Sequence, residues 1–571
     1  MRVVGRVLLA VVGGLLLVAG AAAAWIVGPD DTVVAGETEF SGTAYTARGL
    51  LNVENLAVAV TAEAAEGEVF IGVGHPVDVS DVVADHDAFR IFQINVGSLA
   101  GAVDPGEEEM PDPRGIDWFD TVSGEGEQAL SYPVDGLAPQ FLIYSADGAP
   151  VTASIGFTVA GTFTFCLVVA GVGVLLFAGS FLLRRRRAPD RPAPKDPGDS
   201  GEAAAGTEDD GSSVAESRPQ KLGGTTVRRA AAVLGAGALV LPLGACSVIP
   251  EIPEQMVDTG TTKVALTPGE LDELWADYDK RYNAANKAAF APKFDGSKLT
   301  AADTGLAADW DRYKAAWMKS DSRTEDGKKE KPDEPEAATT SGDWVSSPAF
   351  DSYPMWAVVD NDGDADDEKK DDKKDKKDDK KDDDESKFST AAVVVKEAAD
   401  EPWKLRTGFV VPKEDLGKFP EVVQAPTAEQ VATVEKIAEA MDRYLETGKK
   451  PKAIDDLGGL KLLRADLKED GQADWASEAD WSLASEAYDD DSVRIIPAGD
   501  TLYAVVDKQV TSRLRFPSDH SPYWNPPSDA VNGVTGSTLY SRRAVASLVR
   551  ITADDKVSIS PYYSWAVPAS G

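Results

Sequence analysis

The sequence predicts a membrane-anchored, multidomain protein. We expect an N-terminal all-β sandwich between two transmembrane helices, followed by tandem α+β domains in which helices pack on curved antiparallel sheets. Three observations lead to this fold class. Two long apolar runs flank a region of short alternating segments, a linker rich in proline, glycine and acids follows, and two blocks of amphipathic helices and then strands fill the C-terminal half.

Composition narrows the classes of function. The chain of 571 residues has room for three or four domains at about 100–200 residues each. It carries 58 Lys and Arg against 96 Asp and Glu, a formal net charge of −38. Such a surface repels nucleic acid and attracts cations or basic partners, so we expect no nucleic-acid partner. The two cysteines, Cys166 and Cys246, can form neither a disulfide framework nor a thiolate zinc site, and no cofactor is predicted.

The first apolar run covers residues 7–27, with Arg2 and Arg6 before it. About 20 apolar residues span a bilayer core, so residues 1–29 are predicted to form a transmembrane helix or an uncleaved signal anchor. The small residues of AGAAAAW leave open a cleavable signal peptide. Both alternatives place the following residues outside the cytoplasm.

The second apolar run, residues 159–183, carries no charge and stops at four arginines, 184–187. Because positively charged flanks are retained in the cytoplasm, the chain is expected to cross the membrane inward here. Residues 184–227 are rich in Pro, Gly, Ser and acids, with almost nothing apolar to bury. We predict a disordered cytoplasmic linker.

A third hydrophobic segment, 228–246, begins with two arginines and ends in Leu243-Gly244-Ala245-Cys246. These four residues resemble the lipobox of bacterial lipoproteins. The resemblance implies cleavage before Cys246 and a diacylglycerol on this cysteine, whereas the alternative is a third transmembrane helix. Under either interpretation the chain crosses outward, so 30–152 and 247–571 are expected to be extracytoplasmic, in a cell envelope.

Residues 30–152 alternate apolar and polar side chains in short runs broken by Gly, Asp and Pro, which predicts the β-sandwich. Two stretches, 68–83 and 117–151, resemble actinobacterial membrane proteins of unknown function. Those proteins pair an outer β-domain with a following transmembrane helix and an arginine-rich end. The resemblance implies a location and assigns no catalytic residue.

The C-terminal half divides into two predicted α+β domains, 262–420 and 427–571. Each opens on a helix-capping signal, Thr267 to Glu270 in the first and Thr427 to Gln430 in the second. The order of helices and then strands resembles NTF2-like domains, which implies a curved sheet around a pocket. A Lys- and Asp-rich insertion, 360–387, interrupts the strands of the first domain and is predicted to be disordered.

The candidate contact residues lie in RFPSDHSPYWNPPSD, between two long strands. They are Asp519, His520, Tyr523 and Trp524. An Asp–His pair can position a general base, and aromatic side chains among prolines can hold a ligand. No catalytic set, phosphate-binding glycine loop or H-E-x-x-H sequence accompanies them.

Two functions follow from these observations. We expect a membrane-anchored binding or scaffolding protein of the cell envelope, held by membrane lipid and contacting an envelope protein or a small ligand. The alternative is an extracytoplasmic hydrolase-like pocket enzyme that uses His520.

Overall fold

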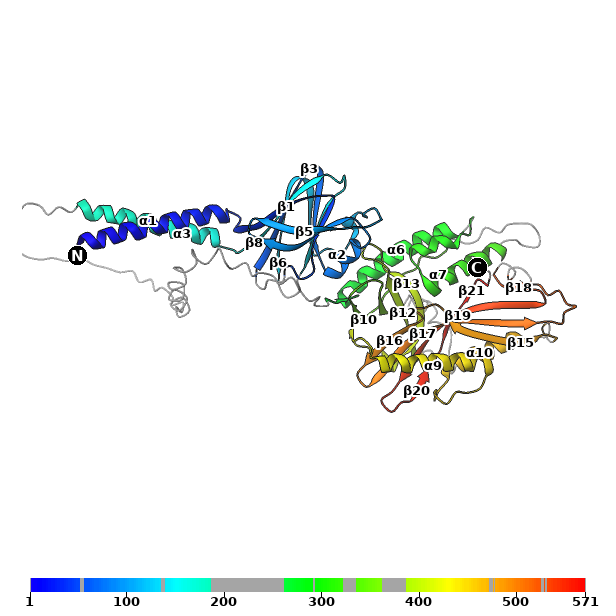
Figure 1. Cartoon of the computed structure of the whole chain (residues 1–571). Helices are drawn as coiled ribbons and strands as arrows, with labels where there is room; N and C mark the ends of the chain where they lie inside the picture. Colours follow the sequence, from blue (N-terminus) through cyan, green and yellow to red (C-terminus); the bar gives the residue numbers. More distant parts are fainter. Residues whose placement is uncertain are drawn as a thin grey trace, which may run out of the picture. The chain divides into compact units, whose positions relative to one another are not determined.

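The computed structural model describes residues 2–51, 56–134, 139–185, 261–290, 293–321, 335–361, 387–471, 476, 478–524, 528 and 531–569. The chain forms two compact units (Figure 1). The first unit comprises Met1–Gly74, Asp87–Glu107 and Trp118–Thr259, and the second comprises His75–His86, Glu108–Asp117 and Gly260–Gly571.

Two apolar helices belong to the first unit, α1 (Arg2–Val27) and α3 (Thr162–Arg185). Their stretches Gly5–Val27 and Thr162–Phe181 are long and apolar enough to cross a membrane. Both helices are found where the sequence predicts membrane spans. The length and apolar composition of the two helices are consistent with membrane association.

The two apolar helices pack closely through glycine. A Cβ atom added at Gly13 would lie 2.6 Å from the backbone nitrogen of Phe177, and one added at Gly173 would lie 2.4 Å from that of Leu17. Gly20 approaches the backbone of Ala170 in the same way, at 2.6 Å. Small residues let helix backbones approach closely, which is how helices associate where no water drives them together.

The strands of the first unit form one eight-stranded sheet in the order β1-β8-β3-β7-β2-β4-β5, with β6 also paired to β3. They are β1 (Thr32–Ser41), β2 (Thr43–Thr46), β3 (Leu56–Gly74), β4 (Ala88–Asn95), β5 (Ser98–Asp104), β6 (Asp120–Val134), β7 (Gln140–Ser145) and β8 (Pro150–Thr158). Alternate residues of β3, including Val58, Val60 and Ala62, are fully buried in its core.

This single sheet differs from the predicted two-sheet sandwich. The 19-residue strand β3 pairs with β8 along its first half and with β7 along its second half, so it joins strands that a sandwich would separate. The sheet also curls: the amide of Gly97, just before β5, donates to the carbonyl of Ala35 in β1 at 2.8 Å. Alternation along the sequence indicates which face is buried but not how many sheets share the core.

The second unit takes two short segments from between strands of the first. One holds α2 (Pro76–Val82), which begins after His75, whose Nδ1 accepts from the Val77 amide at 3.2 Å. The other holds the 3₁₀ turn η1 (Pro113–Gly115). The two segments are joined by a bridge in which the Glu108 amide donates to the Asp85 carbonyl at 3.1 Å.

Two sheets form the body of the second unit, one from each half of residues 261–569. The first contains β9 (Lys263–Val264), β10 (Val345–Phe350), β11 (Met355–Asp360), β12 (Phe388–Lys396), β13 (Lys404–Pro412) and β14 (Val422–Val423). The second contains β15 (Asp480–Ala487), β16 (Val493–Ala498), β17 (Thr501–Arg515), β18 (Gly533–Thr535), β19 (Thr538–Ile551), β20 (Val557–Ile559) and β21 (Tyr563–Val567).

The two sheets share a strand plan. In the first, β10, β11, β12 and β13 follow one another as an antiparallel meander. In the second, β17 and β19 form the middle rows, β15 and β16 share one outer row, and β18, β20 and β21 share the other. Each half therefore places helices before a meander of strands, in agreement with the predicted order, and the first sheet adds an edge row in which β9 and β14 pair with β10.

Helices precede each meander: η2 (Pro268–Glu270), α6 (Leu271–Ala289), η3 (Gly296–Ala301) and α7 (Gly305–Asp321) in the first half, and the short α8 (Lys413–Leu416), α9 (Ala428–Thr447) and α10 (Gly458–Gly471) before the second. Both predicted capping boxes are confirmed. The Thr267 amide donates to Glu270 Oε2 at 2.7 Å, and the Thr427 amide donates to Gln430 Oε1 at 2.8 Å.

The two halves share one core, whereas tandem domains would each have a core of their own. Val393 and Phe409 of the first sheet pack with Tyr503 and Val505 of the second. On the outer faces, α6 covers the first sheet and α9 and α10 cover the second. In β12 both alternate sets are buried, Ala391 and Val393 on one face and Ala392 and Val394 on the other, so this sheet needs cover on both sides.

Several sequence-based predictions lie outside the described residues. These are the linker beyond residue 185, the third hydrophobic segment with Cys246, and residues 362–386 of the Lys/Asp insertion. They stay predictions.

Candidate ligand-binding site

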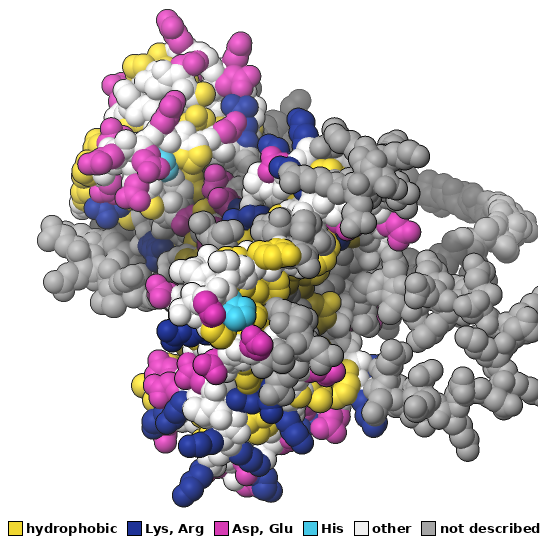
Figure 2. Space-filling model, turned by 90° about the vertical axis from the view of Figure 1, so that its right-hand side faces the viewer, with side chains coloured by type: hydrophobic (Ala, Val, Ile, Leu, Met, Phe, Trp, Pro, Cys, Tyr) yellow, Lys and Arg dark blue, Asp and Glu magenta, His cyan; other side chains and the backbone are white. Residues whose placement is uncertain are grey.

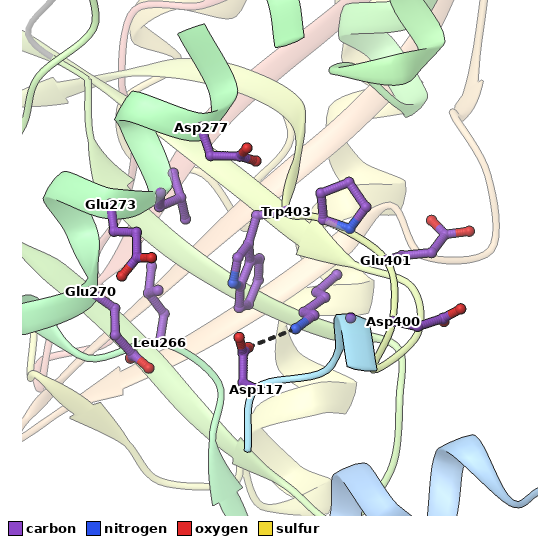
Figure 3. Close-up of a pocket in the computed structure, with 12 residues that line it drawn as sticks. Asp117, Leu266, Glu270, Glu273, Asp277, Asp400, Glu401 and Trp403 are labelled. Carbon is purple, nitrogen blue, oxygen red and sulfur yellow. Dashed lines mark hydrogen bonds and ion pairs between the residues drawn. The ribbon is translucent and has the colours of Figure 1, made fainter. Parts of the chain in front are cut away.

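A pocket of about 390 Å³ lies in the second unit beside Trp403 (Figure 3). Its volume is within the range of small-ligand sites, about 300–1,000 Å³. Six carboxylates and a single ammonium group, that of Lys396, line it. The carboxylates are Asp117, Glu270, Glu273, Asp277, Asp400 and Glu401.

Helical spacing places half of these acids together. Glu270, Glu273 and Asp277 are separated by three and four residues along η2 and α6, so they lie on one face. Asp400 and Glu401 come from the connection between β12 and β13, which leads into Trp403. In Figure 3 these two groups of acids flank the indole from opposite sides.

Arg281 fixes the position of Trp403. Its guanidinium donates to the Trp403 carbonyl at 2.6 Å and to the Ala301 carbonyl at 2.7 Å, and it forms an ion pair with Asp277 at 2.7 Å. A planar guanidinium with several donors can hold three acceptors at once. The loop that carries Trp403 is therefore tied to α6, the helix that supplies acids to the pocket.

The pocket acids differ in how far their charge is already balanced. Asp117, Asp277 and Glu401 have cationic partners within 3.0 Å, namely Lys396, Arg281 and Lys404. Glu270 is engaged in its capping box. By contrast, Glu273 and Asp400 are exposed and have no cationic partner among the described residues.

This arrangement suits a positively charged organic group. A cation over the face of an indole is attracted by the negative face of the ring, and nearby carboxylates add a longer-range attraction. Acidic side chains are spread widely over the visible surface (Figure 2), so acidity alone does not single out a site. The concavity and the indole distinguish this one. Among the described residues no group of His, Cys, Asp and Glu is arranged to hold a metal ion.

The four residues predicted as contacts lie apart from this pocket. His520 places Nδ1 3.1 Å from Asp519 and Nε2 3.2 Å from Glu478, and its ring stacks on Phe516. Tyr523 is 75% exposed. His520 thus lies in an exposed loop, where it contacts the carboxylates of Asp519 and Glu478.

Trp524 lines a second, larger cavity of about 790 Å³, and its Nε1 donates to the Gly533 carbonyl at 3.0 Å. Tyr313 and Trp317 of α7 also line it, with ring centroids 6.0 Å apart and planes 18° from parallel. Its charges are balanced, since Arg542 and Arg543 are matched by Asp466 and Glu469. Of the four predicted residues, Trp524 lines this second cavity, and none lines the Trp403 pocket.

Sequence reasoning missed the Trp403 pocket. The run Asp400-Glu401-Pro402-Trp403, directly before a strand, was a usable signal because it joins two acids to an aromatic residue. No local pattern could predict that Asp117 lines the same pocket, because it lies 286 positions before Trp403 in the sequence (403 − 117).

No protein-family model, no curated protein and no solved structure matched the chain. The fold and the pocket define a class: a chain with two helices able to span a membrane, β-rich units with mixed α/β content, and an acidic pocket around a tryptophan.

Proposed function

We propose that this protein is a membrane-anchored binding protein of the cell envelope that recognises a basic partner through the Trp403 pocket. In this proposal α1 and α3 hold the chain in the membrane, residues 30–152 and 247–571 are extracytoplasmic, and 184–227 are cytoplasmic. The two apolar helices support the anchoring, and the arginines that follow the second run support the orientation.

One observation carries the binding proposal. Six carboxylates surround the indole of Trp403 in a pocket that holds a single ammonium group. Glu273 and Asp400 have no cationic partner among the described residues, so an incoming cation would not have to displace a residue paired with them. A cavity of about 390 Å³ suits one lysine or arginine side chain. We therefore propose a lysine or arginine side chain, presented by a partner polypeptide, as the ligand.

The test measures binding of a labelled octapeptide that alternates lysine with glycine, at about 0.15 M salt to screen long-range attraction. We expect Trp403→Ala to weaken binding by about 5- to 30-fold, because a partly desolvated cation–π contact contributes about 1–2 kcal/mol. Glu273→Gln should weaken it by less. Fluorescence anisotropy of the peptide gives both dissociation constants.

Two matched variants control for general effects of charge and of tryptophan. Trp524→Ala removes an indole from the other cavity, and Glu439→Gln removes an exposed carboxylate on α9. Both should bind the peptide as the unmodified chain does. Equal losses in Trp403→Ala and Trp524→Ala would contradict the proposal, as would equal binding of a peptide with glutamate in place of lysine.

The hydrolase alternative receives less support. Within the described residues, the two nitrogens of the His520 ring contact the carboxylates of Asp519 and Glu478. Neither carboxylate is a nucleophile that a general base would activate by removing a proton. Loss of a measured turnover in His520→Ala, with the fold intact, would favour the enzyme over the binding protein.

A further inference from the structure

The segments 75–86 and 108–117 are built into the second unit although they lie between strands of the first in sequence. Val77 is 1% exposed and packs in one cluster with Ala265 and Met355, against which Tyr353 and Trp403 also pack. An apolar side chain of α2 is thus buried in a small apolar cluster with Met355 of the first sheet. Burial of this kind is typical of a folded interface rather than of a loop lying on a surface.

A buried ion pair lies beside this apolar contact. Asp78, also 1% exposed, accepts from Lys263 Nζ at 2.7 Å through one oxygen and from the Tyr353 hydroxyl at 2.8 Å through the other. Burial, reinforced by the Asp78 charge, raises the pKa of Tyr353, so this hydroxyl stays a donor. Both oxygens of a buried carboxylate are therefore satisfied by residues far away in sequence.

Two further contacts extend the interface. The Ala399 amide donates to Asp81 at 2.8 Å, and Lys396, which is buried, lies 3.0 Å from Asp117. All of these partners lie between residues 263 and 399. The contacts that hold the segments include an apolar contact, the ion pairs of Asp78 and Asp117, and the hydrogen bonds to Asp78 and Asp81. They do not depend on the chain being continuous between residues 186 and 260.

We propose that segments 75–86 and 108–117 form a docking element that binds residues 261–569 non-covalently, so that the N-terminal and C-terminal products stay associated after the chain is cut between residues 186 and 260. If Cys246 is processed as the lipobox resemblance implies, the N-terminal product is the membrane receptor of the lipoprotein. This inference does not rest on ligand binding at Trp403.

The experiment uses the full chain in detergent, with a specific protease site placed between residues 200 and 210 and an affinity tag at the C-terminus. After cleavage, we expect the N-terminal fragment to be retained with the tagged fragment. Asp78→Asn should weaken retention by about 30-fold or more, because it leaves Lys263 without its buried partner. The rate at which the N-terminal fragment leaves the tagged fragment gives this ratio.

Asp120→Asn, which changes an exposed aspartate on β6, is the matched control and should not alter retention. A charge exchange, Asp78→Lys with Lys263→Asp, should restore part of the retention that either single change removes. Circular dichroism of each uncut variant shows whether it folds. Immediate separation of the unmodified fragments would overturn the proposal. Equal retention of the unmodified chain and Asp78→Asn would also overturn it, since association would then reside in the membrane helices or the micelle.

Discussion

At the scale of single residues, two buried aspartates in the second unit share an unfavourable environment. Asp303 accepts from the Tyr278 hydroxyl at 2.9 Å and neighbours Asp311. Burial raises the pKa of Asp303 well above its ordinary value, and Asp311 adds to the rise; burial also raises the pKa of Asp311. Two neighbouring buried carboxyls disfavour carrying two negative charges, so the pair retains a proton to a higher pH than exposed aspartates do.

The sign of the pH dependence follows from these pKa values. A carboxyl whose pKa is higher in the folded than in the unfolded state stabilises the fold fully below the unfolded pKa, about 4. This contribution is lost as the pH rises through the folded pKa. The pair therefore makes the free energy of unfolding smaller at pH 8 than at pH 5.

We predict that Asp311→Asn raises the free energy of unfolding at pH 8 by on the order of 1 kcal/mol and reduces its dependence on pH. The amide removes one ionisable group and can still donate to Asp303. Thermal or urea unfolding at pH 5 and pH 8 measures both effects, with Glu439→Gln as the exposed control. Equal destabilisation at both pH values would show that the pair does not share a proton.

At the scale of elements, the packing of α1 against α3 depends on glycine at particular positions. Gly13 faces the backbone of α3 with no room for a side chain, whereas a Cβ at the adjacent Gly14 meets nothing within 4 Å. The same substitution at the two positions therefore changes the hydrophobicity of α1 equally, but only at Gly13 does the new side chain meet α3.

We predict that Gly13→Leu destabilises the helix pair by about 1–3 kcal/mol, the usual cost of overpacking, and that Gly14→Leu has little effect. The measurement is the rate at which a protease cuts next to α1 in detergent, which rises when the helices separate. Similar rates in the two variants would mean that α1 and α3 do not pack through this face, and would favour a removable signal peptide.

At the scale of the second unit as a whole, the shared core makes its two halves interdependent. Phe409 is fully buried in the core between the sheets, whereas Phe388, on the neighbouring strand, is 37% exposed. Loss of a large buried side chain leaves a cavity, because the surrounding residues relax only partly into the space.

We predict that Phe409→Ala lowers the free energy of unfolding by about 3–5 kcal/mol, and that both sheets lose amide protection together. Phe388→Ala should cost much less. Hydrogen exchange followed for β12 and for β17 separates the outcomes: loss of protection confined to β12 and its neighbours would mean that the halves unfold as independent domains.

Features that depend on local patterns could be predicted from the order of the residues alone. Apolar runs predicted α1 and α3, capping boxes predicted the starts of the helical segments that open with η2 and α9, and alternation predicted the β-structure of residues 30–152. Each depends on residues within a few positions of one another, because helix caps, amphipathic faces and strand alternation are set by the backbone repeat. For the site, this local reasoning selected Trp524, which lines the second cavity, and overlooked Trp403, which lines the acidic pocket.

Three features became visible in the folded chain alone: the number of sheets in each core, the core shared by the two halves, and the set of acids that lines the pocket beside Trp403. The curled single sheet follows from the pairing of β3 with both β7 and β8, and the shared core follows from two-faced apolar strands. The pocket joins Asp117 to acids more than 150 residues away (270 − 117 = 153). Periodicity shows that a face is buried, but the partner that covers it is chosen by shape and charge complementarity between segments distant in sequence.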